Sequence, residues 1–158
     1  MLITILLAGC LAGRAVAQEA GVLTASTVQD LAMTYDSLLS LGDPVGLDDL
    51  LAPEFSREIV AEGKSDAVKQ SRQAFLASIT ESLSETDIIL THKRSPFSIR
   101  FNAAGDEAEV EYTVTDHART AEGTEYIATI GTLLRAGLRD GQPRILSIRN
   151  ETRYKNRE

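Results

Sequence analysis

The second half of the chain consists of alternating apolar and polar residues separated by very short connections. Turn-forming residues occur at 102–106, at 121–123 and at Asp140-Gly141. Connections of this length join neighbouring antiparallel strands, whereas a parallel pair needs a crossover of about a dozen residues. The sequence therefore predicts an antiparallel meander and excludes a doubly wound α/β sheet.

The strands of this meander are indicated by an apolar period of two. Such alternation occurs at 88–94, 97–101, 108–114, 126–138 and 146–152. Ser95-Pro96 separates the first two runs, because proline cannot donate a hydrogen bond to a neighbouring strand. Gly131 and Gly137 lie inside the longest run, where glycine often marks a bulge or a bend. We therefore expect a curved sheet.

The first half of the chain has the apolar period of helices instead. The predicted helices start at Ser26-Thr27, at Asp43-Pro44 and at Ser65-Asp66, where side chains suited to capping precede apolar stripes. Gly42 is expected to end the first helix and Pro53 the second. Helices first and a meander afterwards predict an α+β fold, with the helices packed on one face of the sheet.

This order of elements resembles the nuclear transport factor 2-like superfamily, which includes the SnoaL-like and ketosteroid-isomerase-like proteins. The resemblance rests on "YDSLLSLGDPVGLDDLLAPEF", "VAEGKSDAVKQSRQAFLASI" and "DEAEVEYTVTDHARTAEGTEYIATIGTLL", and it covers about residues 27–153. It implies a cone-shaped α+β fold in which about three N-terminal helices pack on a strongly curved antiparallel sheet that wraps a cavity. Because members range from isomerases and hydrolases to binding and protein-association modules, the resemblance does not select a function.

The N-terminal segment carries no charge from Leu2 to Gly13. A run of this length is typical of a signal-peptide core, and it is shorter than the roughly 20 residues of a membrane-spanning helix. Ala15-Val16-Ala17 fits a small-x-small cleavage site, whereas Leu7-Ala8-Gly9-Cys10 fits a lipobox whose cysteine becomes lipidated. The first alternative uses the whole apolar run and is the one we expect.

Cleavage after Ala17 divides the chain into a signal peptide, a short tether and a single domain, at residues 1–17, 18–25 and 26–158. The protein is then expected to be periplasmic or secreted, and a lipoprotein attached through Cys10 is the alternative. Cys10 is the only cysteine, so the domain is expected to lack disulfides. This favours a bacterial periplasm over a small, disulfide-stapled extracellular module.

Charge and motif content argue against several classes of function. The formal net charge is −7 and no basic stripe occurs, so neither nucleic acid nor an anionic membrane surface is an expected partner. The two histidines, His92 and His117, are far apart and lack ligand spacing, so no metal site is expected. Neither a glycine-rich phosphate loop nor a Gly-x-Ser-x-Gly motif is present, and no cofactor is expected.

A few polar residues share the apolar phase of the predicted strands. His92 is in phase with Leu90, and Asp116 is in phase with Val114. A carboxylate can orient an imidazole for acid-base chemistry, so His92 and Asp116 are the candidate catalytic residues. The alternative is that both side chains are solvated, because they lie near strand ends. The predicted ligand pocket is mainly apolar and includes Tyr35, Tyr112, Tyr126, Ile130 and Asn150.

Two functions of different classes follow from these observations. The favoured one is a non-catalytic exported module that binds a small apolar or amphipathic molecule, or that associates with proteins, for example as a homodimer through the outer sheet face. The alternative is a cofactor-free SnoaL-like isomerase, dehydratase or hydrolase that uses His92 with Asp116. A hydrogen bond between these side chains inside a pocket would favour the enzyme, and exposure of either one to bulk solvent would argue against it.

Overall fold

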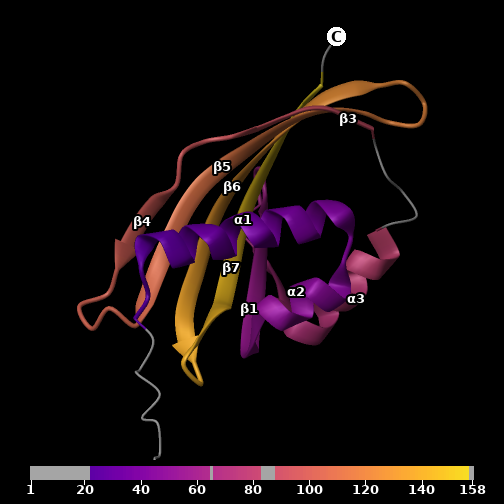
Figure 1. The fold of residues 1–158 in the computed structure, drawn as a ribbon. Coiled ribbons are helices and arrows are strands. Elements are labelled where there is room, and N and C mark those ends of the chain that lie inside the picture. The colour runs from indigo at the N-terminus through magenta and orange to yellow at the C-terminus, as the bar shows by residue number, and fades with distance from the viewer. Residues whose placement is uncertain (1–21, 65, 83–87, 157–158) are drawn as a thin grey trace, which may run out of the picture.

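The computed structural model describes residues 22–64, 66–82 and 88–156, which form three helices and one curved seven-stranded sheet (Figure 1). The predicted signal peptide, with Cys10, lies outside the described residues. None of the helices in the described part of the chain is long and apolar enough to cross a membrane.

The first two helices form where the capping residues predict them. Helix α1 (Ala25–Leu41) begins at an N-cap two residues before the predicted Ser26, where the Thr24 side chain accepts a hydrogen bond from the Thr27 backbone N–H. It ends at Gly42, whose φ of 62° is left-handed. In α2 (Pro44–Leu50), the Asp43 side chain accepts hydrogen bonds from two backbone N–H groups of the first turn.

The third helix, α3 (Arg72–Ser82), begins later than the sequence predicts. The residues before it form strand β2 (Val68–Ser71), which pairs antiparallel with β1 (Leu51–Ala61). The predicted start at Ser65-Asp66 is wrong because this segment covers an edge of β1. An unpaired strand edge offers a row of backbone hydrogen bonds, and these outweigh a local capping pattern.

The remaining strands form the predicted meander. They are β3 (Ile88–Arg94), β4 (Ser98–Phe101), β5 (Glu107–Arg119), β6 (Glu125–Arg139) and β7 (Gln142–Asn156), and the sheet order is β2-β1-β7-β6-β5-β3. Strands β3 and β4 pair with successive parts of the same edge of β5. The break between them falls at Ser95-Pro96, as predicted, and the Ser95 N–H still donates to the Thr113 carbonyl oxygen at 2.9 Å.

One pairing departs from the predicted antiparallel sheet. Strand β1 runs parallel to β7, with Arg57 opposite Ile148 and Ile59 opposite Asn150. The prediction rested on tight turns, and these constrain only the strands that they join. Because strands β2 to β6 lie between β1 and β7 along the chain, no turn joins these two strands or fixes their relative direction. The all-antiparallel sheet is therefore wrong at this pair, whereas the α+β class, the curved sheet and the three helices are confirmed.

The helices lie on the concave side of the sheet, and α1 crosses in front of β5, β6 and β7 (Figure 1). The core between these layers includes fully or almost fully buried side chains from both, namely Val28, Leu31, Tyr35, Leu47, Phe75, Val110, Leu134 and Ile148. Burial of each large apolar side chain stabilises the fold by roughly 1.5–3 kcal/mol. This packing fixes the helices over one part of the concave face.

The strand register places the concave-face side chains in rows that cross the sheet. The first row is Val110, Leu134 and Ile148, the second is Tyr112, Thr132 and Asn150, the third is Arg94, Val114, Ile130 and Thr152, and the fourth is His92, Asp116, Ala128 and Tyr154. Burial decreases along this series, from fully buried Val110 and Leu134 in the first row to Tyr154, which is 64% exposed. The cone is therefore packed at one end and open at the other, and we call the third and fourth rows the open end.

A glycine in β6 makes room for the bulge that bends this sheet. The pairing of β6 with β7 shifts between Arg135 and Ala136, where β7 contains the extra residue Leu146. A Cβ atom on Gly137 would lie 2.8 Å from the Leu146 Cδ1 atom, and Leu146 is itself buried. The missing side chain at Gly137 is thus a packing requirement of the bend.

We expect Gly137→Ala to lower the free energy of unfolding by about 1–3 kcal/mol, because the added methyl group overpacks a buried contact. Gly131→Ala in the same strand is the matched control, since a Cβ atom there would have no neighbour closer than 3.9 Å. Urea denaturation followed by circular dichroism measures both variants. Equal stabilities of the two variants would contradict the assignment of Gly137 to this contact.

Candidate functional site

Polar side chains interrupt the apolar interior at the second row and next to it. This polar layer consists of Tyr35 and Asp36 of α1, Arg57 of β1, Arg94 of β3, Tyr112 of β5, Thr132 of β6 and Asn150 of β7. The register of the meander aligns the residues from β5, β6 and β7 across the sheet. Because α1 crosses in front of these strands, its inward-facing residues meet the layer (Figure 1).

Asp36 links α1 to the sheet. Its Oδ1 atom accepts a hydrogen bond of 2.7 Å from the Tyr112 hydroxyl, and its Oδ2 atom accepts one of 3.0 Å from Arg94 Nη1. The Arg94 guanidinium also lies over the Phe97 ring, 4.8 Å from its centroid. Each oxygen of the carboxylate accepts a hydrogen bond from a fixed donor, so Asp36 ties α1 to β5 and β3.

A second set of contacts connects β1, β6 and β7. The Asn150 side-chain amide donates to the Thr132 hydroxyl at 3.0 Å, and its carbonyl oxygen accepts from Arg57 Nε at 2.9 Å. The Arg57 guanidinium lies over the ring of Phe75, 5.1 Å from the centroid. Asn150 is almost fully buried, and these bonds satisfy its amide, as a buried polar group requires.

Both tyrosines of the polar layer hold their protons more tightly than an exposed tyrosine. Burial raises the pKa of Tyr35 to about 12, with the positive charge of Arg57 acting in the opposite direction and the negative charge of Asp36 in the same one. Burial also raises the pKa of Tyr112 far above its usual range, and the charge of Asp36 and the hydrogen bond to it add to the effect. The two hydroxyls therefore remain neutral at physiological pH.

We expect stability to fall as the pH rises from about 10 to about 12. In this range the unfolded chain loses the Tyr35 proton while the folded protein keeps it, so the folded state binds more protons and loses stability with increasing pH. The slope that Tyr35 contributes is about 1.4 kcal/mol per pH unit. Urea denaturation at several alkaline pH values should therefore give a shallower decline for Tyr35→Phe than for the wild type. Identical declines would contradict the raised pKa of Tyr35.

The predicted catalytic pair comes together in the fourth row. His92 and Asp116 are cross-strand neighbours on β3 and β5, and the His92 Nδ1 atom lies 2.7 Å from Asp116 Oδ1. The His92 side chain is 49% exposed and that of Asp116 is 19% exposed. The hydrogen bond is present, as the enzyme hypothesis requires, but the imidazole is half exposed to solvent. A catalytic role of the pair stays a prediction.

The five residues of the predicted ligand pocket lie in two groups. Tyr35, Tyr112 and Asn150 belong to the polar layer and are at most 5% exposed, whereas Ile130 and Tyr126 are only half buried. Tyr126 packs against Tyr154, with their ring centroids 6.0 Å apart. It is six residues from the level of the polar layer along β6, which corresponds to about 20 Å of strand. Only Ile130 and Tyr126 are therefore accessible from the open end.

Three residues of the polar layer were not selected from the sequence. Arg94 has the same strand phase as His92, and this phase is the only sequence pattern that points to a position inside the cone for any of the three. Asp36 follows Tyr35 on α1, but a charged residue at the border of an apolar stripe is usually solvated. Arg57 lies on β1, whose parallel pairing with β7 is not encoded by any turn.

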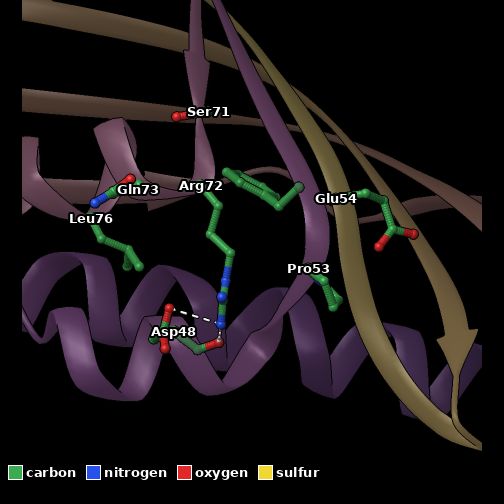
Figure 2. Close-up of a pocket in the computed structure, with 8 residues that line it drawn as sticks. Asp48, Pro53, Glu54, Ser71, Arg72, Gln73 and Leu76 are labelled. Carbon is green, nitrogen blue, oxygen red and sulfur yellow. Dashed lines mark hydrogen bonds and ion pairs between the residues drawn. The ribbon is translucent and has the colours of Figure 1, made fainter.

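A separate hollow of about 610 Å³ lies outside the cone, between α2, β1 and the start of α3 (Figure 2). Its lining includes Pro53, Phe55 and Leu76 together with charged residues. Figure 2 shows Arg72 reaching across to Asp48, and their side chains form an ion pair of 2.8 Å. Because its principal cation is already paired, this hollow is a weaker candidate site than the open end.

The described part of the chain contains no group of three or more His, Cys, Asp or Glu side chains arranged to hold a metal ion. No protein-family model matches the chain, and no curated protein matches it either. The comparison with solved structures is informative, because many of them share the fold.

Three solved structures illustrate this similarity. A hexachlorocyclohexane dehydrochlorinase, LinA type 2, is 13% identical with a TM-score of 0.66, over 84% of this chain and 88% of that one. A nuclear transport factor 2-like protein from Cytophaga hutchinsonii is 14% identical with a TM-score of 0.62, over 83% and 100%. An uncharacterized protein with a cystatin-like fold from Caulobacter vibrioides is 18% identical with a TM-score of 0.60, over 81% and 88%.

Helices on the concave side of a curved, mostly antiparallel sheet place the protein in the cystatin-like α+β class. Within that class, the protein has the nuclear transport factor 2-like fold that the sequence resemblance implies. Identities of 13–18% establish the fold alone. The structures that share it include both an enzyme and proteins without an assigned activity, so function has to be argued from the site.

Proposed function

We propose that the protein is a binding module that takes up a small amphipathic molecule at the open end of its cone. The observation that supports this most is the composition of the fourth row and its neighbours. Tyr126, Ile130 and Tyr154 leave apolar surface accessible there, directly beside the polar pair His92–Asp116. Ligand sites typically combine such apolar surface with a few polar groups that orient the ligand.

Binding is favoured over catalysis because the carboxylate and the hydroxyl that face each other in the polar layer are hydrogen-bonded to fixed partners. The Asp36 carboxylate is occupied at both oxygens, and the hydroxyl of Tyr112 is committed to Asp36. Acid-base catalysis needs a group that can exchange a proton with the bound substrate. At the open end, Nδ1 of the half-exposed His92 contacts Asp116. The other ring nitrogen, Nε2, lies outside this contact and is the candidate for exchanging a proton with a substrate.

The binding proposal can be tested with the fluorescent probe 8-anilinonaphthalene-1-sulfonate, which becomes bright in apolar sites. The folded wild-type protein should bind the probe at one saturable site. Tyr154→Ala should weaken this binding severalfold, because it removes exposed aromatic surface. Arg153→Ala, on the neighbouring residue of β7 that points to the opposite face, is the matched control and should leave binding unchanged. Equal probe binding by both variants would contradict a site at the open end.

A second candidate function is supported by the 2.7 Å contact between His92 and Asp116. In a cofactor-free dehydratase, His92 Nε2 would remove a proton from the carbon next to a substrate carbonyl. The resulting imidazolium would then give that proton to the hydroxyl group on the neighbouring carbon, which leaves as water. Asp116 would hold the imidazole through Nδ1. The similarity to a dehydrochlorinase is consistent with an elimination reaction but extends to the fold only.

This candidate is tested by assaying loss of water from simple β-hydroxyketones, which produces an ultraviolet-absorbing enone. His92→Gln should lower turnover by about 100-fold or more, as the loss of a general base does. A wild-type rate no higher than that of His92→Gln would contradict the enzyme hypothesis. Arg153→Ala should retain full turnover as the control.

The proposal also includes export and self-association. The apolar N-terminal segment supports export with cleavage before Gln18. Mass spectrometry of the protein from a periplasmic fraction would identify either this mature N-terminus or a lipidated Cys10. An intact Met1 in a cytoplasmic fraction would contradict export. The outer sheet face is not covered by helices (Figure 1), which supports a homodimer through this face. Analytical ultracentrifugation should give the mass of a dimer, and the mass of a monomer would contradict this association.

A further inference from the structure

The charges of the polar layer do not balance. The layer contains two guanidinium groups, of Arg57 and Arg94, but only one carboxylate, that of Asp36, and this carboxylate is paired with Arg94. Among the described residues, no carboxylate forms an ion pair with Arg57, whose contacts are the Asn150 oxygen and the face of the Phe75 ring. The layer therefore has one uncompensated positive charge, and Arg57 carries it.

Three buried polar atoms of the described residues lack hydrogen-bond partners, and two of them belong to residues that neighbour Arg57 or contact the same Phe75 ring. One is the hydroxyl of Tyr35, which is only 2% exposed, and the other is the side-chain oxygen of Gln70. Gln70 is the direct cross-strand neighbour of Arg57 on β2, so their Cβ atoms are about 5 Å apart. Tyr35 and Arg57 both contact the Phe75 ring, from which the Tyr35 centroid is 6.5 Å away. Partnerless buried polar atoms are rare and call for a missing partner.

We propose that Arg57, Tyr35 and Gln70 form a binding site for a single carboxylate group. The Nε atom of Arg57 is used by Asn150, which leaves the two Nη groups to donate to the two oxygens of a carboxylate. The Tyr35 hydroxyl supplies a further donor, and Gln70 supplies its amide NH₂ after a rotation that exchanges its oxygen and nitrogen. One monoanion neutralises the excess charge of the layer.

The guanidinium of Arg57 is well placed to receive such a ligand. Arg57 and Gln70 are both half-buried, so the site lies at the border between the fully buried Tyr35 and the solvent next to the β1–β2 pair. Arginine holds a carboxylate in a planar, two-bonded arrangement that a lysine cannot reproduce. This site is distinct from the open end, and the inference does not depend on the ligand proposed there.

The test uses sodium benzoate as the probe and neutral benzamide of the same shape as its counterpart. Equilibrium dialysis of the full chain should show one benzoate site and far weaker binding of benzamide. Arg57→Gln should weaken benzoate binding by about tenfold or more, because it removes the positive charge and the charge-assisted hydrogen bonds to the carboxylate. Arg57→Lys should recover only part of the affinity. Arg153→Gln removes the same charge from the opposite face of the sheet and should bind benzoate normally.

A second variant keeps the test decisive if Arg57→Gln fails to fold. Tyr35→Phe removes a hydroxyl that has no partner in the folded protein, so the fold should persist while benzoate binding weakens severalfold. Unchanged benzoate binding in both Arg57→Gln and Tyr35→Phe would overturn the proposal, and so would equal binding of benzoate and benzamide. Binding of 8-anilinonaphthalene-1-sulfonate at the open end should be unaffected by Tyr35→Phe, so failure of this site and failure of the proposed function are distinguishable.

Discussion

Phe75→Ala is expected to lower the free energy of unfolding by about 3–5 kcal/mol, the usual range for removing a buried aromatic ring. Phe75 is fully buried, and its ring packs against those of Phe55 at 5.5 Å and Tyr35 at 6.5 Å between centroids. Together with Ile79, it joins α3 to the core, and it also carries the Arg57 guanidinium on its face. The substitution therefore creates a cavity and removes a cation–π contact together.

Urea denaturation of the purified protein measures this loss. Phe101→Ala is a matched control, because Phe101 is 41% exposed at the end of β4 and its truncation should cost about 1 kcal/mol or less. Phe75→Leu should lie between alanine and the wild type, since it retains most of the buried volume. A loss for Phe75→Ala no larger than that for Phe101→Ala would show that α3 does not depend on this ring.

The parts of the fold that were predictable from the sequence are those that local geometry determines. The turns at 102–106, 121–123 and Asp140-Gly141 determine the direction of β5, β6 and β7, because two strands joined by so few residues have no other arrangement. The caps next to Asp43 and Gly42 likewise act on neighbouring backbone groups. The parallel pair of β1 with β7 and the strand at Val68–Ser71 depend on contacts between distant segments, and no local pattern encodes them.

The candidate site divides in the same way. Strand phase placed Tyr112 and Asn150 inside the cone, and it put His92 and Asp116 on the apolar phase of their strands. That these two residues are cross-strand neighbours depends on the pairing of β3 with β5, which no single turn joins. Phase alone could not show that Asp36 of α1 would meet Tyr112, since this contact depends on how the helix crosses the sheet. The unpaired charge of Arg57 was also invisible, because charge balance is a property of the assembled layer.

The second large effect is expected for Asp36→Ala, which should lower the free energy of unfolding by about 2–4 kcal/mol. The substitution removes the acceptor of two donors and leaves the almost fully buried Tyr112 hydroxyl without its bond. It also leaves Arg94, whose side chain is 26% exposed, without its counter-ion. A fully buried pair costs about 3–5 kcal/mol to break, and the partial exposure of Arg94 reduces this value.

Companion variants separate the charge from the hydrogen bond. Asp36→Asn keeps an oxygen acceptor for Tyr112 but not the negative charge, so it should be less damaging than alanine. Adding Tyr112→Phe to Asp36→Ala should cost little more, because the hydroxyl removed is one that Asp36→Ala has already left unpaired. Asp30→Ala, at an exposed position of the same helix, is the control and should change stability by less than about 0.5 kcal/mol.

The double-variant cycle between Asp36 and Tyr112 decides whether the polar layer holds α1 on the sheet. If the two single losses simply add, the 2.7 Å contact contributes nothing to stability, and the helix is held by apolar packing alone. If the double variant is no less stable than Asp36→Ala, the hydroxyl and the carboxylate act as one unit. We expect this second result, because neither group has access to enough solvent to replace its partner with water.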